Sequence, residues 1–289
     1  MVCFRADLHC HSDYSDGSMS PEDLVDHAAA IGLKGLSITD HDTIGAYEKA
    51  MCRAEECDVL LLPGVEISAS YKETSVHILG YSFHHKSASV HSLCQKRLEQ
   101  RYRRNKKIVG LLRGKGIVFD EEDLLFLGEE GGNEKLFSVG RLHIAQVLQR
   151  KGFVSNIQEA FDRYIGDNKP CYDPGERCSV EEAIKAIRQG GGVAVLAHPH
   201  LIKRRRAVRD LLKMDFDGLE GYYARLPLSQ EKKWLDFAKE RGCLLTGGSD
   251  FHGTSKPHVE MGCSWVSEEV FMFLYKLYRD NVRRNVDSV

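Results

Sequence analysis

The amino-acid sequence predicts an α/β protein built as a distorted (β/α)7 TIM-like barrel that carries an all-helical insertion. Two observations lead to this fold class. Short apolar segments of strand type alternate with helical segments towards both ends of the chain, and the stretch between them shows helical patterns only. Alternating units imply a mostly parallel sheet, and with roughly seven strands a closed barrel leaves no sheet edge unpaired. A length of 289 residues suffices for one barrel with an inserted module.

The first part of the predicted barrel occupies residues 1–89, where strand and helix signals alternate at short range. Ser20 followed by Pro21 and Asp23 is typical of a helix N-terminus, because the serine side chain caps the first turn and proline fits its first position. The expected elements are, in order, a strand at Ala6–His11, a helix from Pro21 to Ile31, a strand at Gly35–Thr39, a helix at Ala46–Cys57, and short strands at Val59–Leu62, Val65–Ser68 and His77–Tyr81.

The predicted insertion covers residues 90–175, and the second part of the barrel covers residues 176–289. The insertion contains the strongly basic segment Lys96–Lys107, which is most simply a solvated helix face; the alternative is a strip that follows the phosphates of a nucleic acid. After it we expect a helix capped by Ser179, strands at Gly192–Ala197, Asp217–Tyr222 and Cys243–Gly247, and helices at Gln230–Arg241 and Glu268–Arg284.

Composition narrows the class of protein. A formal charge of −2 gives no general attraction to nucleic acid or to a membrane surface. No segment approaches the roughly 20 apolar residues of a membrane span, and the N-terminus lacks the pattern of a signal peptide. Nine cysteines without a C-x-x-C pair fit buried thiols in a reducing compartment. We therefore expect a cytoplasmic protein without a membrane association or an obligate protein partner.

Two histidines begin the candidate site. Side chains alternate between the faces of a strand, so His9 and His11 point the same way while Cys10 points to the opposite face. Two imidazoles on one face are suited to binding a divalent metal. The pair alone is weak evidence, because two surface histidines near a strand end would look the same.

Further residues of ligand type follow the other expected strands. Carboxyl ends of the strands in a β/α barrel gather on one face, and the chemistry of such barrels is built there. One residue fits less well, since His77 opens its expected strand instead of following it. The candidate ligands beyond His9 and His11 are Asp16, His41, Glu66, His77, His198, Asp250 and His252.

The charges of this set favour phosphate chemistry. Six neutral histidines and three carboxylates would serve about three divalent ions, with roughly three protein ligands each. About three positive charges would remain in excess, which suits a phosphate ester better than a neutral amide. Such a site would hold phosphoryl oxygens and generate a hydroxide nucleophile near neutral pH.

Together these segments resemble the PHP (polymerase and histidinol phosphatase) family of metal-dependent phosphoesterases. The matching segments run from Asp7 to Gly253 in the expected order: DLHCHSDYSDGSMSPEDLV, LSITDHDTIG, LPGVEIS, HILGY, VLAHPH and LTGGSDFHG. The segments GRLHIAQVL and FDRYIGDNKPCYDPGE are similar to those of stand-alone bacterial members that carry a helical insertion.

The resemblance implies two to three divalent ions, manganese foremost, although imidazole and carboxylate suit iron(II) and zinc as well. Asp16 stands where many relatives have histidine, and Glu66 would bridge two ions. The implied ligand sets are His9, His11, Glu66 and Asp250 for one ion, Glu66, His77 and His198 for a second, and Asp16, His41 and His252 for a third.

The resemblance also implies the substrates, which are nucleoside 3′,5′-bisphosphates and short single-stranded, 5′-phosphorylated oligonucleotides degraded from the 5′ end. A hydroxide held between two metals at Glu66 and Asp250 would attack phosphorus. His200 could protonate the leaving oxygen, or it is a supporting or surface histidine. The candidates for binding substrate phosphate are Arg141, His143 and, within Lys203–Arg206, Arg204; Tyr172 could stack on a base but fits an inward-packed tyrosine better.

Three alternatives stay open. Histidinol-phosphate phosphatase is the second candidate within the phosphoesterases. An amidohydrolase also begins with H-x-H on a barrel, but such enzymes commonly bridge two metals with a modified lysine, where this chain has Glu66. A non-catalytic nucleotide-binding module is the candidate of another class, although every ligand position is filled here.

Overall fold

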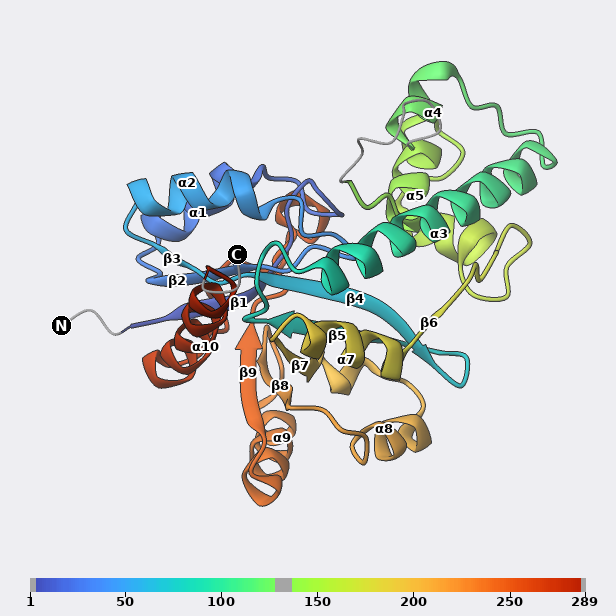
Figure 1. Ribbon diagram of the computed structural model, residues 1–289. Coiled ribbons are helices and arrows are strands. Elements are labelled where there is room, and N and C mark those ends of the chain that lie inside the picture. The colour runs from blue at the N-terminus through green and yellow to red at the C-terminus, as the bar shows by residue number, and fades with distance from the viewer. Residues whose placement is uncertain (1–3, 128–136, 287–289) are drawn as a thin grey trace.

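The structure is a computed structural model that describes residues 4–127 and 137–286. It is an α/β fold with two sheets (Figure 1). The smaller sheet is parallel and has the order β1-β2-β3, with β1 at Ala6–Cys10, β2 at Gly35–Ile38 and β3 at Leu60–Leu61. The larger sheet has the order β6-β4-β5-β7-β8-β9, with strands at Cys178–Ser179, Gly64–Tyr71, Thr74–Tyr81, Val193–Leu196, Gly218–Tyr223 and Leu244–Gly248 in that order.

A closed barrel is not confirmed, because hydrogen bonding divides the strands between these two sheets. The sheets nevertheless meet at two places. The Asp250 amide donates to the His9 carbonyl over 2.7 Å, and the Asp42 amide donates to the Glu66 carbonyl over 2.9 Å. A side chain at Gly248 would lie 2.4 Å from the His9 amide nitrogen, so glycine is needed where β9 approaches β1. Candidate ligands therefore lie at both junctions.

Strands β4 and β5 form an antiparallel hairpin, which differs from the expected arrangement of separate short strands. Lys72 and Glu73 at its tip both have positive φ, 43° and 64°, as two-residue hairpin turns require. Strand β5 begins at Thr74, so the expectation that His77 opens a strand is wrong. Inside the hairpin His77 pairs with Ser68, and Ser68 is two residues from Glu66 on β4.

Helices cover both sheets. Helices α1 (Pro21–Ala30) and α2 (Tyr47–Glu56) pack together beside the smaller sheet through Leu24, Leu36 and Ala50 (Figure 1). Ser20 caps α1 by accepting a hydrogen bond from the Asp23 amide, as expected. The remaining helices of these parts are α7 (Val180–Gln189), α8 (Arg205–Leu211), α9 (Leu228–Arg241) and α10 (Glu268–Val286), with short 3-10 turns at Pro199–Leu201 and Gly253–Ser255. No helix in the described ranges is long and apolar enough to span a membrane.

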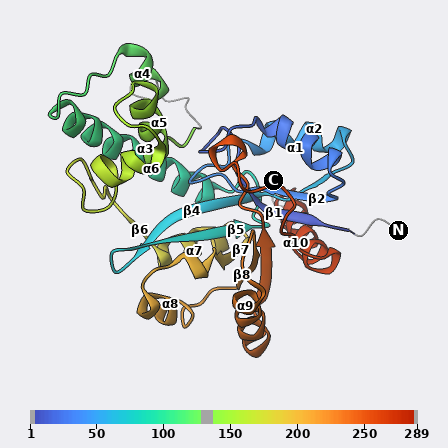
Figure 2. The same cartoon turned by 180° about the vertical axis from the view of Figure 1, so that it is seen from behind.

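The described elements between residues 88 and 165 are all helical and form a lobe, called here the helical lobe. Figures 1 and 2 show this lobe projecting from the sheets, apart from α1 and α2. It has its own apolar core, which includes Ile108, Leu112, Ile144 and Leu148. Its elements are α3 (Ala88–Arg113), α4 (Glu121–Phe126), α5 (Arg141–Arg150), α6 (Ile157–Ala160) and a π-helical turn at Phe161–Ile165.

Hydrogen bonds join the lobe to β4 and to the loops after β1 and β2, near the candidate ligands. Arg101 of α3 donates to the Asp42 carboxylate over 2.6 Å and to the Ser68 hydroxyl over 2.7 Å. The Ser138 amide donates to the Tyr14 carbonyl over 2.6 Å. Because Arg97 and Arg101 are buried, the interpretation of Lys96–Lys107 as a simple solvated face is wrong for one side of α3.

Candidate metal centre

All nine candidate ligands meet in one place, although they come from six segments that are far apart in the sequence. His9 lies on β1 and His11 directly after it, and both are fully buried; Glu66 lies on β4, and His77 lies on β5. Neighbouring imidazole rings are 4.1 to 5.8 Å apart between centroids, from His11–His252 to His9–His198. The other members follow β1, β2, β7 and β9: Asp16, His41, His198, Asp250 and His252.

Glu66 lies at the middle of the group. Its Oε1 accepts hydrogen bonds from His77 Nδ1 and His198 Nε2, both over 2.9 Å. Its Oε2 lies 3.2 to 3.3 Å from a nitrogen of His9, of His11 and of His41. The two oxygens therefore face two different sets of histidines, as a carboxylate that bridges two ions would.

Asp250 presents only one oxygen to the centre. Its Oδ1 lies 3.5 Å from His9 Nε2 and 3.3 Å from His11 Nε2. Its Oδ2 accepts hydrogen bonds from the Tyr223 hydroxyl over 2.5 Å and from the Lys256 ammonium over 2.6 Å. These two donors fix the orientation of the carboxylate, so Oδ1 is the oxygen that can bind an ion.

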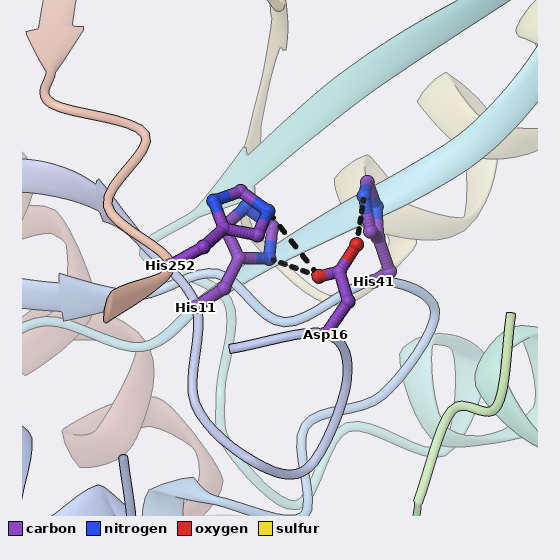
Figure 3. A group of neighbouring side chains, drawn as sticks. All are labelled: His11, Asp16, His41 and His252. Atoms are coloured by element: carbon purple, nitrogen blue, oxygen red, sulfur yellow. Dashed lines mark ion pairs between the residues drawn. The ribbon is translucent and has the colours of Figure 1, made fainter. Parts of the chain in front are cut away.

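Asp16 gathers the third set of side chains (Figure 3). Its carboxylate lies 3.3 Å from His252 Nε2, 3.5 Å from His11 Nδ1 and 3.8 Å from His41 Nε2. The loop that carries it turns back on β1, because a side chain at Gly17 would lie 2.1 Å from the His11 carbonyl oxygen. The buried carboxylate of Asp40 accepts hydrogen bonds from the hydroxyls of Ser12 and Ser15 and so holds this loop.

Unpartnered ring nitrogens indicate that the group fits divalent cations. His9 Nε2, His11 Nε2 and His41 Nδ1 are buried and have no hydrogen-bond partner in the described part of the chain. Buried polar atoms rarely remain unpaired, and each of these faces a carboxylate oxygen across a gap that an ion would occupy. Four overlapping groups of three or four ligand atoms could each hold one ion: His9, Glu66 and His198; His9, His11 and Asp250; His41, Glu66 and His77; and His11, Asp16, His41 and His252.

The electrostatics are those of a cation site. Burial alone would raise the pKa of Glu66 and of Asp250, but the surrounding histidines hold both pKa values well below the usual range. Against the effect of burial, the carboxylates of Asp250 and Glu66 raise the pKa of His11 to about 10. Protons on the histidines therefore balance the carboxylates in the metal-free protein, and metal binding would displace them.

Glu220 is a supporting residue that the sequence reasoning missed. It lies on β8, is fully buried, and its Oε1 accepts a hydrogen bond from His9 Nδ1 over 2.8 Å. Its Oε2 accepts another from the His198 amide over 2.8 Å. With Nδ1 protonated, Nε2 of His9 is left free to bind an ion. Glu220 is the one charged residue in the strand sequence GLEGYY. Because a buried charge needs a partner, this glutamate could have indicated a contact with the site.

The predicted substrate residues are only partly brought together. His143 lies at the start of α5, where its ring accepts a hydrogen bond from the Gly140 amide. Burial lowers the pKa of His143, and the charge of the Asp16 carboxylate partly offsets this effect. Arg141 pairs with Asp167 over 3.0 Å and lies over the rings of Phe161 and Tyr172. His200 packs edge-on against Tyr223, and burial lowers its pKa to about 4, so at neutral pH it is uncharged. This does not favour His200 as the proton donor.

Arg204 is not near the centre. It is exposed and donates to the Lys72 carbonyl at the tip of the β4–β5 hairpin. Lys72 directly follows β4 and is six residues beyond Glu66, a separation of roughly 20 Å in a strand. The expectation that Lys203–Arg206 lies beside the site because it follows His198 in the sequence is therefore wrong. The chain leads α8 outward after the short turn at Pro199–Leu201.

Comparison with known proteins places this geometry in a family. The PHP domain matches residues 7–165. A 5'-3' exoribonuclease of Haemophilus influenzae is 33% identical over 91% of this chain and 92% of its own length. A 3',5'-nucleoside bisphosphate phosphatase of Chromobacterium violaceum is 30% identical over 89% of this chain and 90% of its own length.

Solved structures agree in fold. A protein of Bifidobacterium adolescentis, assigned as a metal-dependent phosphoesterase, superposes with a TM-score of 0.83 at 30% identity and covers 94% of this chain and 96% of its own. A Chromobacterium violaceum protein named an amidohydrolase, which contains sulfate and no metal, superposes with a TM-score of 0.80 at 27% identity over 96% of both chains.

Proposed function

The chain belongs to the PHP domain family of metal-dependent phosphoesterases, and on this premise we propose that it hydrolyses phosphate esters of nucleotides. The substrates we propose are nucleoside 3′,5′-bisphosphates and short 5′-phosphorylated oligonucleotides, in line with the names of the two relatives. The observation that carries the proposal is the position of Glu66, whose two oxygens face two sets of histidines.

We propose two to three divalent ions, manganese foremost, held by the ligand sets that the family resemblance implies. Bound ions would neutralise phosphoryl oxygens and lower the pKa of a coordinated water. His11 also lies close to Asp16, so it is within reach of two of the proposed sets. The ends of the strands from both sheets meet here, which supports the view of the fold as a barrel split at two junctions, with residues 90–175 as its insertion.

Neighbouring residues of the protein would orient the metal ligands. Glu220 holds His9 with Nε2 towards the centre, and Tyr223 and Lys256 hold Asp250 with Oδ1 towards it. His9 and His11 are fully buried, whereas the side chain of His77 is 27% exposed and that of Asp16 is 20% exposed. Substrate would therefore approach from the side of His77 and Asp16, which is also the side that the helical lobe adjoins through Arg101 and His143.

Phosphate release by the manganese-loaded protein tests the proposal. Adenosine 3′,5′-bisphosphate, a short 5′-phosphorylated RNA and histidinol phosphate should be compared at equal concentration. We expect the two nucleotide substrates to react faster by at least tenfold. Faster reaction of histidinol phosphate would contradict the substrate class. Hydrolysis of a cyclic amide without any phosphate release would favour the amidohydrolase alternative.

Metal analysis separates an enzyme from a binding module. The protein purified in the presence of manganese should retain at least two ions per chain, because two of the groups, His9, Glu66 and His198 and His9, His11 and Asp250, consist of buried residues only. Fewer than two retained ions would favour the non-catalytic module.

A further inference from the structure

A group of exposed cations lies where the tip of the β4–β5 hairpin meets the start of α8 (Figure 1). Arg204 donates a hydrogen bond to the Lys72 carbonyl and so joins the two segments. All side chains of the group are exposed to solvent. The group, called here the basic surface, consists of Lys72, Lys203, Arg204, Arg205, Arg206 and Arg209.

Helix α8 holds these cations on a fixed support. Leu211 belongs to the apolar core below the larger sheet, and Val208, Leu212 and Tyr71 of β4 pack against the same core. The Tyr71 hydroxyl also donates to the Asp210 carboxylate over 3.2 Å. The apolar side of the helix therefore faces inward, and its cations face solvent.

The basic surface has an excess of positive charge. Six cations share the segments 72–73 and 203–210 with two carboxylates, Glu73 and Asp210. Asp210 forms an ion pair with Lys72 over 3.3 Å, and the other cations have no carboxylate within ion-pair distance in the described parts of the chain. Four positive charges are therefore in excess here, although the whole chain has a formal charge of −2.

Carboxylates that approach the hairpin from the side of the lobe have partners of their own. Asp167 pairs with Arg141, and Glu176 pairs with Arg103, both over 3.0 Å. These carboxylates are therefore matched by arginines that do not belong to the basic surface.

Helix stability does not explain the charges on α8. Arg205 and Arg206 lie in its first turn, where a cation is unfavourable because it faces the positive end of the helix dipole. The same turn has no acidic residue that would offset them. An anionic partner explains the accumulation of cations better than folding does.

The basic surface lies at the same end of the larger sheet as the metal centre. Strands β4 and β7 both pair antiparallel with β5, so their carboxyl ends point the same way. His198 follows β7, and Lys203 is five residues further on. The other segment of the surface begins at Lys72, beyond the carboxyl end of β4.

The distance between the surface and the centre indicates the length of the partner. Lys72 is roughly 20 Å beyond Glu66 along the strand direction. This distance corresponds to about six nucleotides at the ~3.4 Å spacing of a stacked strand, and to fewer in an extended strand. A bisphosphate at the centre cannot reach the basic surface, whereas an RNA of several nucleotides can.

We propose that the basic surface binds the phosphate backbone of an RNA whose 5′ end is held at the metal centre. The inference rests on the proposed function and extends its substrates from bisphosphates and short oligonucleotides to RNAs of about six nucleotides or more. Contacts of this kind give affinity without a preference for sequence.

The dependence of the reaction on RNA length tests the surface in the manganese-loaded protein. The α8 variant carries Lys203→Gln, Arg205→Gln and Arg206→Gln and keeps Arg204, which holds the hairpin tip. At about 50 mM salt it should lower kcat/KM for a 5′-phosphorylated 12-nucleotide RNA by about tenfold or more. It should change kcat/KM for a 5′-phosphorylated dinucleotide by less than twofold. Equal losses for both RNAs, or no loss for the longer one, would overturn the proposal.

A matched control separates the position of the charges from their number. The α10 variant carries Lys276→Gln, Arg279→Gln and Arg283→Gln, which are the same residue types at exposed positions. Figures 1 and 2 both show α10 apart from α8. The α10 variant should leave both kcat/KM values within twofold. A loss for the longer RNA as large as that of the α8 variant would show an effect of net charge alone and overturn the proposal.

Binding of RNA to the metal-free protein does not depend on catalysis. Fluorescence anisotropy measures the Kd of the 12-nucleotide RNA between about 50 and 200 mM salt. The α8 variant should reduce the slope of log Kd against log salt concentration by about 1 to 2, because each phosphate contact of a single strand contributes roughly 0.7. The α10 variant should preserve the slope. An unchanged slope in the α8 variant would overturn the surface even if the enzyme is active.

A different partner and a failure of the proposed function give different results. If vesicles that contain phosphatidylserine bind the wild-type protein but not the α8 variant, while both proteins bind the RNA equally, the surface binds a membrane and the proposal is overturned. If no ester releases phosphate while RNA binding still depends on the α8 cations, the proposed function fails and the binding surface stands.

Discussion

The metal centre and the helical lobe differ in the groups that they offer to a ligand. The centre collects buried imidazoles and carboxylates from strand ends, whose positions are fixed by two sheets and by supporting residues such as Glu220. The lobe offers arginines from a helix and a loop, several of them half-buried or exposed. Under the proposed function, the sheets would hold the groups that react with the substrate, and the lobe would hold groups that select it.

Replacing the bridging carboxylate should have the largest effect on activity, and only the metal centre should be affected. Glu66→Ala should lower kcat by roughly 10³-fold, or about 4 kcal/mol, because both sets of histidines lose the shared ligand. Phosphate release and far-ultraviolet circular dichroism measure activity and fold. Glu55→Ala, at an exposed position of α2, is the control. Near-normal turnover of the Glu66 variant would contradict the assignment.

Removing the charge behind His9 should have the next largest effect. Glu220→Gln preserves the size of the side chain but weakens the hydrogen bond to His9 Nδ1, so manganese affinity should fall by about 10- to 100-fold. Titration with manganese measures the affinity, and Arg104→Gln, on α3 of the helical lobe, should leave it unchanged. Equal losses in both variants would remove the proposed separation between the two regions.

The same contrast explains what could be predicted from the sequence. His9, His11, Asp16 and Glu66 lie in short motifs beside apolar strands, so the order of the elements and the candidate ligands could be read from local patterns. The β4–β5 hairpin was missed because its turn is Lys72-Glu73, without the glycine or asparagine that signals such turns. The division into two sheets depends on hydrogen bonds between distant strands, which periodicity does not contain.

Supporting and lobe residues could not be predicted for a related reason. Glu220 and Asp40 are recognised by the groups they touch, and those contacts join residues that are distant in sequence. Arg101 and Arg104 belong to one basic run, in which only the packing of α3 distinguishes the side chains facing the site from those in solvent. Arg204 shows the converse error, since closeness in sequence to His198 did not bring it to the centre.

The ion pair of Arg101 with Asp42, which joins the lobe to the metal centre, should make the stability of the fold depend on pH. Burial would raise the pKa of Asp42, but Arg101 and Arg97 lower it to about 2. Because the pKa is lower in the folded than in the unfolded state, the carboxylate stabilises the fold above pH ~4, and this contribution is lost as the pH falls through about 2.

Urea unfolding at pH 5 and at pH 2 measures this contribution. The wild-type protein should exceed Asp42→Asn in unfolding free energy by about 2 kcal/mol at pH 5, and by much less at pH 2. A difference that does not depend on pH would show that Asp42 is not the charged partner of Arg101.

For a bisphosphate, the smallest effect is expected at the tip of the hairpin. Arg204→Gln should change kcat/KM for adenosine 3′,5′-bisphosphate by less than twofold, because Arg204 is exposed and contacts Lys72 instead of the lobe or the centre. Steady-state kinetics beside Arg104→Gln test this. A loss of kcat/KM as large as that of the Arg104 variant would show that the bisphosphate also contacts the tip of the hairpin.

If residues from six distant segments form one metal centre, anomalous scattering from manganese-soaked crystals should locate the ions among them. We expect at least two manganese peaks, with Glu66 shared between them and His9, His11 and Asp250 around one. Crystals of Glu66→Ala should lose at least one of these peaks. Peaks elsewhere on the protein, with none among these side chains, would show that the six segments do not form a metal centre.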